Sequence, residues 1–219
     1  MFLASFGVLQ AQESETRSVD SFRGIKAGEA IDVYLKKGTK EGVKVEVTGI
    51  SLSKIITEVS GTSLRIHRES GNYRNKNTVK VYVTYVNLEK ISANHASNVF
   101  SEGTIKANSL DINISSAASV EASLDVETLT VDASSAGNAV LEGKASSVVI
   151  EANSAGDIDA YGLQSNSVRA SANSGGSAKI SVLKELDAHA NSGGSIRYRG
   201  NPTKTNTGSN SGGSVKKSN

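Results

Sequence analysis

Residues 133–137 read Ala-Ser-Ser-Ala-Gly, residues 152–156 read Ala-Asn-Ser-Ala-Gly, and residues 172–176 read Ala-Asn-Ser-Gly-Gly. Variants of this pattern occur seven times from residue 88 onward, each anchored at an Asn or a Ser. The anchors are Asn94, Ser115, Ser134, Asn153, Asn173, Asn191 and Asn210, with successive intervals of 21, 19, 19, 20, 18 and 19 residues. Self-similarity at a nearly constant period is typical of repeat architectures.

Apolar residues precede each anchor at alternate positions, which is the pattern of a strand with one buried face. Two such columns read Leu110, Leu129, Val148, Val168, Leu186 and Ile91, Ile112, Val131, Ile150, Ala170, Ala188. Beyond the small residues a third column reads Val99, Val120, Ala139, Ile158, Ala178, Ile196, Val215. Glycines at 103, 143, 162 and 200 follow, where positive φ carries no steric cost. Each repeat is predicted to be a strand, a tight bend, a second strand and a turn.

A unit of two short strands cannot bury its apolar face alone, so neighbouring repeats must stack with parallel pairing. The sequence therefore predicts an all-β fold, a right-handed parallel β-helix or β-solenoid with coils of about 19 residues. The handedness follows the rule for parallel crossover connections. With about 4.8 Å between coils, the six intervals span roughly 29 Å. We interpret the small-residue motif as a corner, with Asn and Ser ladders along the axis.

Three segments are expected along the chain. Residues 1–12 resemble the remnant of a secretory signal peptide, because residues 1–9 (MFLASFGVL) are apolar and Leu9-Gln10-Ala11 resembles a cleavage site. This stretch is too short to span a membrane, and the alternative is an ordinary first strand. Residues 13–87 are expected to form wider coils and an atypical N-terminal cap in the same domain, although a separate small sheet domain is the alternative. Residues 88–219 form the regular coils.

Composition argues against several classes of function. The chain has 24 basic and 22 acidic residues and no long run of either sign, which argues against a nucleic-acid partner. Cysteine is absent, so the chain can form no disulfide bond and no thiolate metal site. No cofactor is expected.

A polysaccharide lyase or hydrolase would need carboxylates converging on one bond. Asp132 and Glu151 share one outward column, and we interpret them as solvated carboxylates, with a weak cation site as the alternative. His67, His95 and His189 are expected to lie too far apart to act together, and the sequence has no Gly-x-Ser-x-Gly elbow. The sequence therefore predicts no catalytic or metal site and a protein that is not an enzyme.

One group of side chains is a candidate ligand-binding site. Tyr161, Lys179, Arg197 and Arg199 are expected on the outward face that follows the bends, on successive coils. An exposed tyrosine beside long cationic side chains can stack on a sugar or pair with acidic groups. The alternative is an ordinary solvated face.

Several segments together resemble a known family. They are Phe22-Arg23-Gly24-Ile25, Ile31-Asp32-Val33-Tyr34-Leu35, Leu64-Arg65-Ile66 and Leu88-Glu89-Lys90-Ile91. In this order they resemble the "putative auto-transporter adhesin, head GIN domain" family of bacterial envelope proteins, from about residue 18 to residue 215. The resemblance implies a β-helix and export to the periplasm, the outer membrane or the cell surface. It carries over no defined site.

We therefore expect a non-enzymatic, exported recognition module that binds a surface glycan or a protein through one face of the β-helix. One alternative is an enzyme that acts on polysaccharide. The other is a purely structural spacer that self-associates, and flat faces with unpaired backbone groups at the coil ends favour a homo-oligomer.

Overall fold

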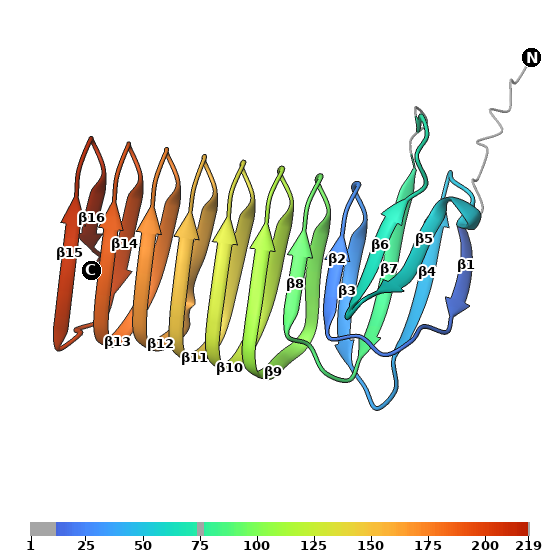
Figure 1. Ribbon diagram of the computed structural model, residues 1–219, viewed down its shortest axis with the longest axis horizontal. Helices are drawn as coiled ribbons and strands as arrows, with labels where there is room; N and C mark the ends of the chain where they lie inside the picture. Colours follow the sequence, from blue (N-terminus) through green and yellow to red (C-terminus); the bar gives the residue numbers. More distant parts are fainter. Residues whose placement is uncertain (1–11, 74–76, 219) are drawn as a thin grey trace, which may run out of the picture.

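Residues 12–73 and 77–218 of the 219-residue chain are described by the computed structural model. The segment interpreted as a signal remnant lies, apart from Gln12, outside these residues. The described chain is all-β, with one 16-stranded sheet and a single short 3-10 helix, η1 (Leu52–Lys54). Along the axis the strands leading into the bends rise in front, and those leaving them descend behind (Figure 1). The predicted right-handed parallel β-helix is confirmed.

The regular coils begin at residue 90. Their strands are β8 (Lys90–Ala93), β9 (Asn98–Ile114), β10 (Ser119–Ala133), β11 (Asn138–Ala152), β12 (Asp157–Ala172), β13 (Ser177–Ala190), β14 (Ser195–Arg199), β15 (Lys204–Ser209) and β16 (Ser214–Lys217). Their pairing is parallel, and the predicted columns are in register: Leu129, for example, lies between Leu110 and Val148. These three side chains are buried. The alternating residues therefore form the core, as predicted.

The second predicted turn takes another form. Strands β9 to β13 each pass through the region of the glycine column without interruption. At Gly143, φ is +104°, and the pairing of β11 with β12 shifts between Val140 and Glu142. Gly103, Gly143 and Gly162 thus lie within continuous strands beside β-bulges, whereas Gly200 lies between β14 and β15, where the predicted turn is present.

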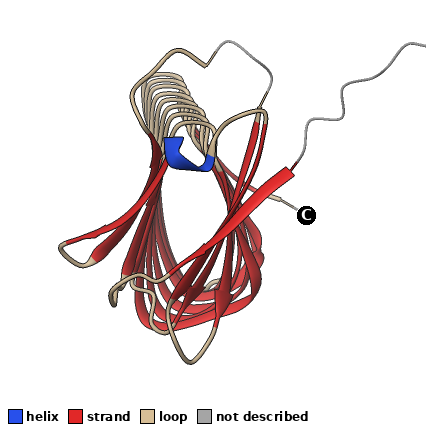
Figure 2. Ribbon diagram, turned by 90° about the vertical axis from the view of Figure 1, so that its right-hand side faces the viewer, coloured by secondary structure: helices blue, strands red, loops and turns tan. Residues whose placement is uncertain are grey.

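Each bend is a two-residue turn with left-handed backbone. Ser154 and Ala155 have φ of 49° and 62°, and the Gly156 amide donates to the Asn153 carbonyl at 2.8 Å. Two successive positive φ angles closed by such a bond define a type I′ turn. Viewed along the axis, the bends stack at one edge of the cross-section, and two layers of strands diverge from them (Figure 2).

The bends are also bonded to one another along the axis. The Ala155 amide donates to the Ser174 carbonyl of the next bend at 3.2 Å. Asn173 Nδ2 donates to Asn153 Oδ1 at 3.2 Å, and Asn191 Nδ2 donates to Asn173 Oδ1 at 3.3 Å. The expected asparagine ladder is therefore present, and hydrogen bonding between coils continues through the corners.

The N-terminal strands are not stacked in sequence order. They are β1 (Gln12–Arg17), β2 (Gly24–Ala27), β3 (Asp32–Lys37), β4 (Gly42–Thr48), β5 (Ile55–Ser60), β6 (Ser63–Arg68) and β7 (Thr78–Tyr85). Strand β2 lies between β6 and β8, and β3 lies between β7 and β9. The coil formed by β6 and β7 is therefore outside the earlier coil formed by β2 and β3. Antiparallel strands complete this end, with β4 on β7, β1 on β4, and β5 on β6.

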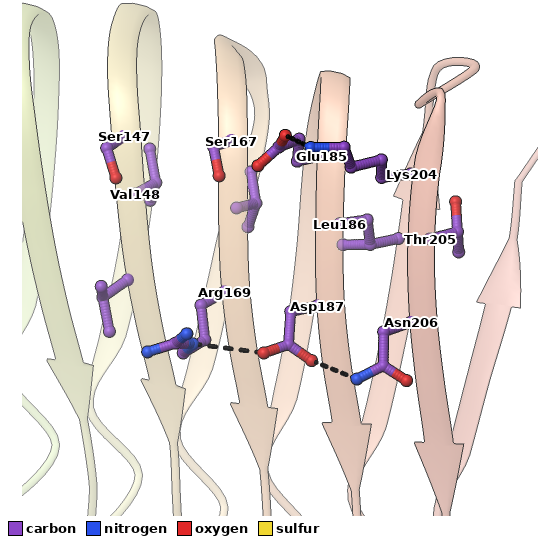
Figure 3. A pocket seen from close by; sticks show the side chains of 12 residues that line it. Ser147, Val148, Ser167, Arg169, Glu185, Leu186, Asp187, Lys204, Thr205 and Asn206 are labelled. Carbon is purple, nitrogen blue, oxygen red and sulfur yellow. Dashed lines mark hydrogen bonds and ion pairs between the residues drawn. The ribbon is translucent and has the colours of Figure 1, made fainter.

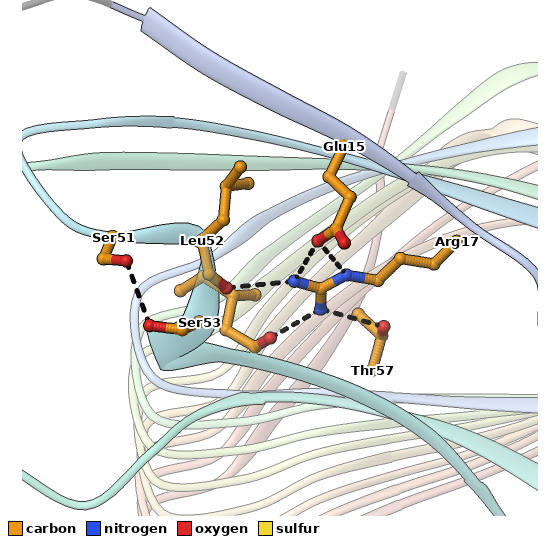
Figure 4. Close-up of polar contacts among 7 residues, drawn as sticks. Glu15, Arg17, Ser51, Leu52, Ser53 and Thr57 are labelled. Atoms are coloured by element: carbon orange, nitrogen blue, oxygen red, sulfur yellow. Dashed lines mark hydrogen bonds and ion pairs between the residues drawn. The ribbon is translucent and has the colours of Figure 1, made fainter.

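Arg17 connects the edge strand β1 to the rest of the N-terminal end by hydrogen bonds (Figure 4). Its guanidinium donates to the Ile55 carbonyl at 2.6 Å, the Leu52 carbonyl at 3.0 Å and Glu15 Oε2 at 2.7 Å. The Arg17 side chain is only 19% exposed. These bonds connect β1 to η1 and to the start of β5.

We expect Arg17→Ala to lower the free energy of unfolding by about 2 kcal/mol, because partly buried carbonyls lose charged donors. Arg17→Lys should restore little, since an ammonium lacks the planar fork that reaches several acceptors. Arg23→Ala is the matched control, because the ion pair of Arg23 with Glu89 is exposed on both sides and should matter little. Chemical denaturation checks both values. Equal effects of Arg17→Ala and Arg23→Ala would contradict the conclusion that the hydrogen bonds of Arg17 stabilise the N-terminal end.

At the C-terminal end, polar residues occupy the positions that are apolar in the preceding coil. In the pairing of β13 with β15, Leu186 is followed by Thr205, Ala188 by Thr207 and Ala190 by Ser209. The three residues of β15 are exposed. An end of this kind offers little apolar surface for stacking against a second molecule.

Candidate ligand-binding face

One outward column of side chains runs the whole length of the sheet on the face that follows the bends. It takes one residue from each of the strands β1, β4, β7, β3, β9, β10, β11, β12, β13, β14 and β16. In that order its members are Thr16, Lys44, Tyr82, Tyr34, Phe100, Glu121, Val140, Asp159, Lys179, Arg197 and Lys216. We call this set the outer column.

Three aromatic rings of the outer column form a ladder. The rings of Tyr34 and Tyr82 are 5.1 Å apart between centroids and 18° from parallel. Tyr34 and Phe100 are 5.3 Å apart and 23° from parallel. Lys44 Nζ lies 5.9 Å from the Tyr82 centroid and closes one end of the ladder. Phe100 is the other end.

A shallow hollow adjoins Phe100 on the side away from Tyr34. It is lined by Phe100, Ser101, Gly103, Glu121, Ala122, Ser123, Val140 and Glu142. Val140 is 45% exposed, which is unusual for a large apolar residue in this chain. Glu121 and Glu142 are exposed, and in the described part of the chain neither carboxylate has a hydrogen-bond or ion-pair partner. The hollow therefore combines an aromatic ring, an apolar side chain and unpaired acceptors.

The four residues singled out in the sequence lie on this same face. Lys179 and Arg197 are consecutive members of the outer column. The Arg199 guanidinium carbon lies 4.0 Å from the Tyr161 ring centroid, although their strands are separated by β13. The Tyr161 hydroxyl lies 2.7 Å from Ser218 Oγ. Tyr161 is therefore partly covered by its own neighbours, whereas Arg197 and Arg199 are exposed.

An ion pair joins Lys179 to the strand before it. Lys179 Nζ lies 2.9 Å from Asp159 Oδ2, and both side chains are about one-third exposed. This hydrogen bond, with the attraction of the carboxylate, raises the pKa of the Lys179 ammonium above its ordinary value. Lys179 is therefore a cation that is already partnered.

The opposite face, which leads into the bends, carries a shallow hollow of about 410 Å³ (Figure 3). Its charged groups satisfy one another: Asp187 accepts from Arg169 Nε at 3.2 Å and from Asn206 Nδ2 at 3.0 Å, and Lys204 pairs with Glu185 at 2.6 Å. Partial burial opposes ionisation of Asp187, but hydrogen bonds from His189, Arg169 and Asn206 prevail and lower its pKa. The charged side chains that line this hollow are therefore already paired with one another.

Asp132 and Glu151 are in register on consecutive strands of that face, where the sequence placed them. Among residues 12–73 and 77–218, no three His, Asp or Glu side chains are grouped so that they could hold a metal ion. Nor does the described chain contain a helix long and apolar enough to cross a membrane.

Comparison with known proteins agrees with the geometry. Residues 21–202 match the family described as "Putative auto-transporter adhesin, head GIN domain". The chain belongs to this family. No curated protein is a detectable relative of this head GIN domain.

Solved structures share the fold of this head GIN domain. A "putative adhesin" from Bacteroides fragilis NCTC 9343 is 24% identical, with a TM-score of 0.86 over 95% of this chain and 97% of that chain. A "putative adhesin" from Parabacteroides distasonis ATCC 8503 is 22% identical, with a TM-score of 0.70 over 95% and 98%. A "putative lipid binding protein" from the same organism is 17% identical, with a TM-score of 0.71 over 95% and 97%. Such identities establish the fold alone.

The aromatic ladder was not identified in the sequence. Its signal is present, because Tyr34 alternates with buried Val33 and Leu35, and Tyr82 alternates with buried Val81 and Val83. That the two tyrosines are neighbours, with Phe100 beside them, depends on the position of β3 between β7 and β9.

Proposed function

We propose that this head GIN domain is a non-enzymatic recognition module, exported to the bacterial cell envelope, that binds a glycan through its outer column. The observation that carries the proposal is the aromatic ladder that ends at Phe100 beside the hollow of Glu121, Val140 and Glu142. The adhesin description of the family supports a role in surface recognition and an envelope location.

The chemistry of the hollow suits a sugar. The Phe100 ring packs on Tyr34 and also lines the hollow, where the C–H groups of a pyranose can stack. Glu121 and Glu142 can accept hydrogen bonds from sugar hydroxyls, and Ser123 can donate or accept. Because the hollow is open and shallow, it fits one unit of a longer chain that lies across the coils.

Binding to immobilised neutral glycans tests the proposal. Phe100→Ala should weaken binding by up to about tenfold, the equivalent of a lost aromatic contact. Phe100→Leu retains apolar volume without a ring and should bind nearly as weakly as Phe100→Ala. Thr130→Ala, on the opposite face, is the matched surface control and should leave binding unchanged. If Phe100→Ala binds as well as the parent chain, the ladder is not a binding platform.

The same experiment also tests the alternative that the protein is an enzyme acting on polysaccharide. A polysaccharide-acting enzyme would release reducing ends from a bound glycan, with a rate that falls in Glu121→Gln or Glu142→Gln. We expect no release of reducing ends, because both carboxylates are exposed and the hollow does not enclose a scissile bond.

A further inference from the structure

Three cations stand side by side at the C-terminal end of the outer column. Lys179 is in register with Arg197, and Arg197 is in register with Lys216. Like charges directly opposite one another on neighbouring strands destabilise a sheet. Asp159 pairs with Lys179, but no carboxylate approaches Arg197 or Lys216 within the described residues. Within the described residues, therefore, Lys179 is compensated by Asp159, whereas Arg197 and Lys216 face each other without an acidic partner.

The residues flanking these cations are not acidic either. In the pairing of β13 with β14 and of β14 with β16, the other outward residues of this face are Ser177, Ser181, Ser195, Arg199 and Ser214. We call Lys179, Arg197, Arg199 and Lys216 the cationic strip. Hydroxyl groups border it on both sides, and Arg199 adds a fourth charge above the ring of Tyr161.

Charges elsewhere on the coils are arranged differently. Asp125 lies between Lys106, at 3.7 Å, and Lys144, at 3.4 Å, from the coils on either side. On the leading face Asp187 bonds to Arg169, and Glu185 pairs with Lys204. In these columns unlike charges alternate along the axis. Like charges are also in register at Asp132 and Glu151 and at Lys26 and Arg65, but the cationic strip places three cations in one row and a fourth beside them, which suits a ligand with several negative charges.

We infer that the cationic strip binds the acidic units of a polysaccharide, such as uronate or sulfated sugars, laid along the axis of the β-helix. This inference rests on the proposed function and specifies its ligand. Arginine suits such groups because its planar donors can hold a carboxylate or sulfate in two bonds. The stacked ring of Tyr161 limits the freedom of Arg199, and the neighbouring serines can bond to sugar hydroxyls.

The outer column also predicts which units of a bound polysaccharide lie at each of its ends. Arg197 lies five strands from Phe100, which corresponds to roughly 24 Å. Glu121 and Glu142 repel an anion at the Phe100 hollow, so that hollow takes a neutral unit while the acidic units lie over the strip. A polymer is favoured over a membrane, because the strip is narrow and bordered by hydroxyls, and the exposed large apolar residues of the described chain, Val140 and Leu183, are not among its members.

Binding of polygalacturonate, compared with the same polymer after reduction of its carboxyl groups, tests the inference on the whole chain. Arg197→Gln/Lys216→Gln should weaken polygalacturonate binding at least tenfold and leave the reduced polymer unaffected. Lys106→Gln/Lys144→Gln is the matched control, because it removes the same net charge from the column of Asp125. It should leave both affinities unchanged. Circular dichroism checks that both variants are folded.

Other results would overturn the inference. Equal losses in the two double variants would mean that net charge alone attracts the polymer. Binding to vesicles that contain phosphatidylglycerol, with no binding to polygalacturonate, would make the strip a membrane contact. Failure of the inference is distinct from failure of the proposed function: the former leaves the Phe100-dependent binding of neutral glycans intact, and the latter abolishes it.

Discussion

Replacing Gly156 by alanine is expected to lower the free energy of unfolding by about 3 kcal/mol or more, because the added carbon would overlap the preceding coil. A Cβ at this position would lie 2.1 Å from the Ala133 carbonyl oxygen. That oxygen also accepts the Asn153 amide at 2.9 Å, so it cannot move away without loss of a bond between coils. Unfolding in denaturant, followed by circular dichroism, measures the change.

Ala155, which precedes Gly156, provides a control in which the free energy of unfolding should not fall. Ala155 holds a left-handed backbone with φ of 62°, a conformation that costs a side chain about 1 kcal/mol. Ala155→Gly should therefore be neutral or stabilising, at the same bend and with a change of one methyl group. If Gly156→Ala and Ala155→Gly have similar effects, the corner does not depend on the close approach of consecutive coils.

The bends show what sequence spacing can reveal. The small-residue motif recurs because the corner repeats, and successive coils meet there closely enough to exclude a Cβ at Gly156, Gly176 and Gly194. Period and alternation therefore predicted the parallel pairing and the inward columns from residue 88 onward. The sequence analysis assigned a turn to each of Gly103, Gly143 and Gly162, which lie within continuous strands. The two cases look alike in the sequence, because a β-bulge and a loop both favour glycine at positive φ.

Non-sequential stacking limited what the sequence could reveal about the site. Lys179 and Arg197 were placed on successive coils correctly, since the repeat sets their register. The ladder of Tyr34, Tyr82 and Phe100 was missed, because the coil of β6 and β7 lies outside the coil that precedes it in sequence. Periodicity relates neighbours in the chain, and it contains no information about a coil inserted out of order.

Leu129→Ala is expected to lower the free energy of unfolding by about 3 kcal/mol, because the removed atoms leave a cavity in a packed column. Leu129 is fully buried between Leu110 and Val148. Both neighbours are fixed by backbone pairing on their own strands, so they cannot close the space. Denaturant unfolding of the parent chain and the variant gives the difference.

Leu183→Ala is the matched control, since it is the same chemical change on a side chain that is 51% exposed. It should cost less than about 0.5 kcal/mol. The contrast between the two leucines tests the assignment of inward and outward positions directly, and a similar loss for both would contradict it. Because each coil packs only on its neighbours, the cavity at Leu129 weakens both interfaces of β10. Hydrogen exchange should then rise in β9 and β11 as well, while β15 and β16 stay unchanged relative to the parent chain.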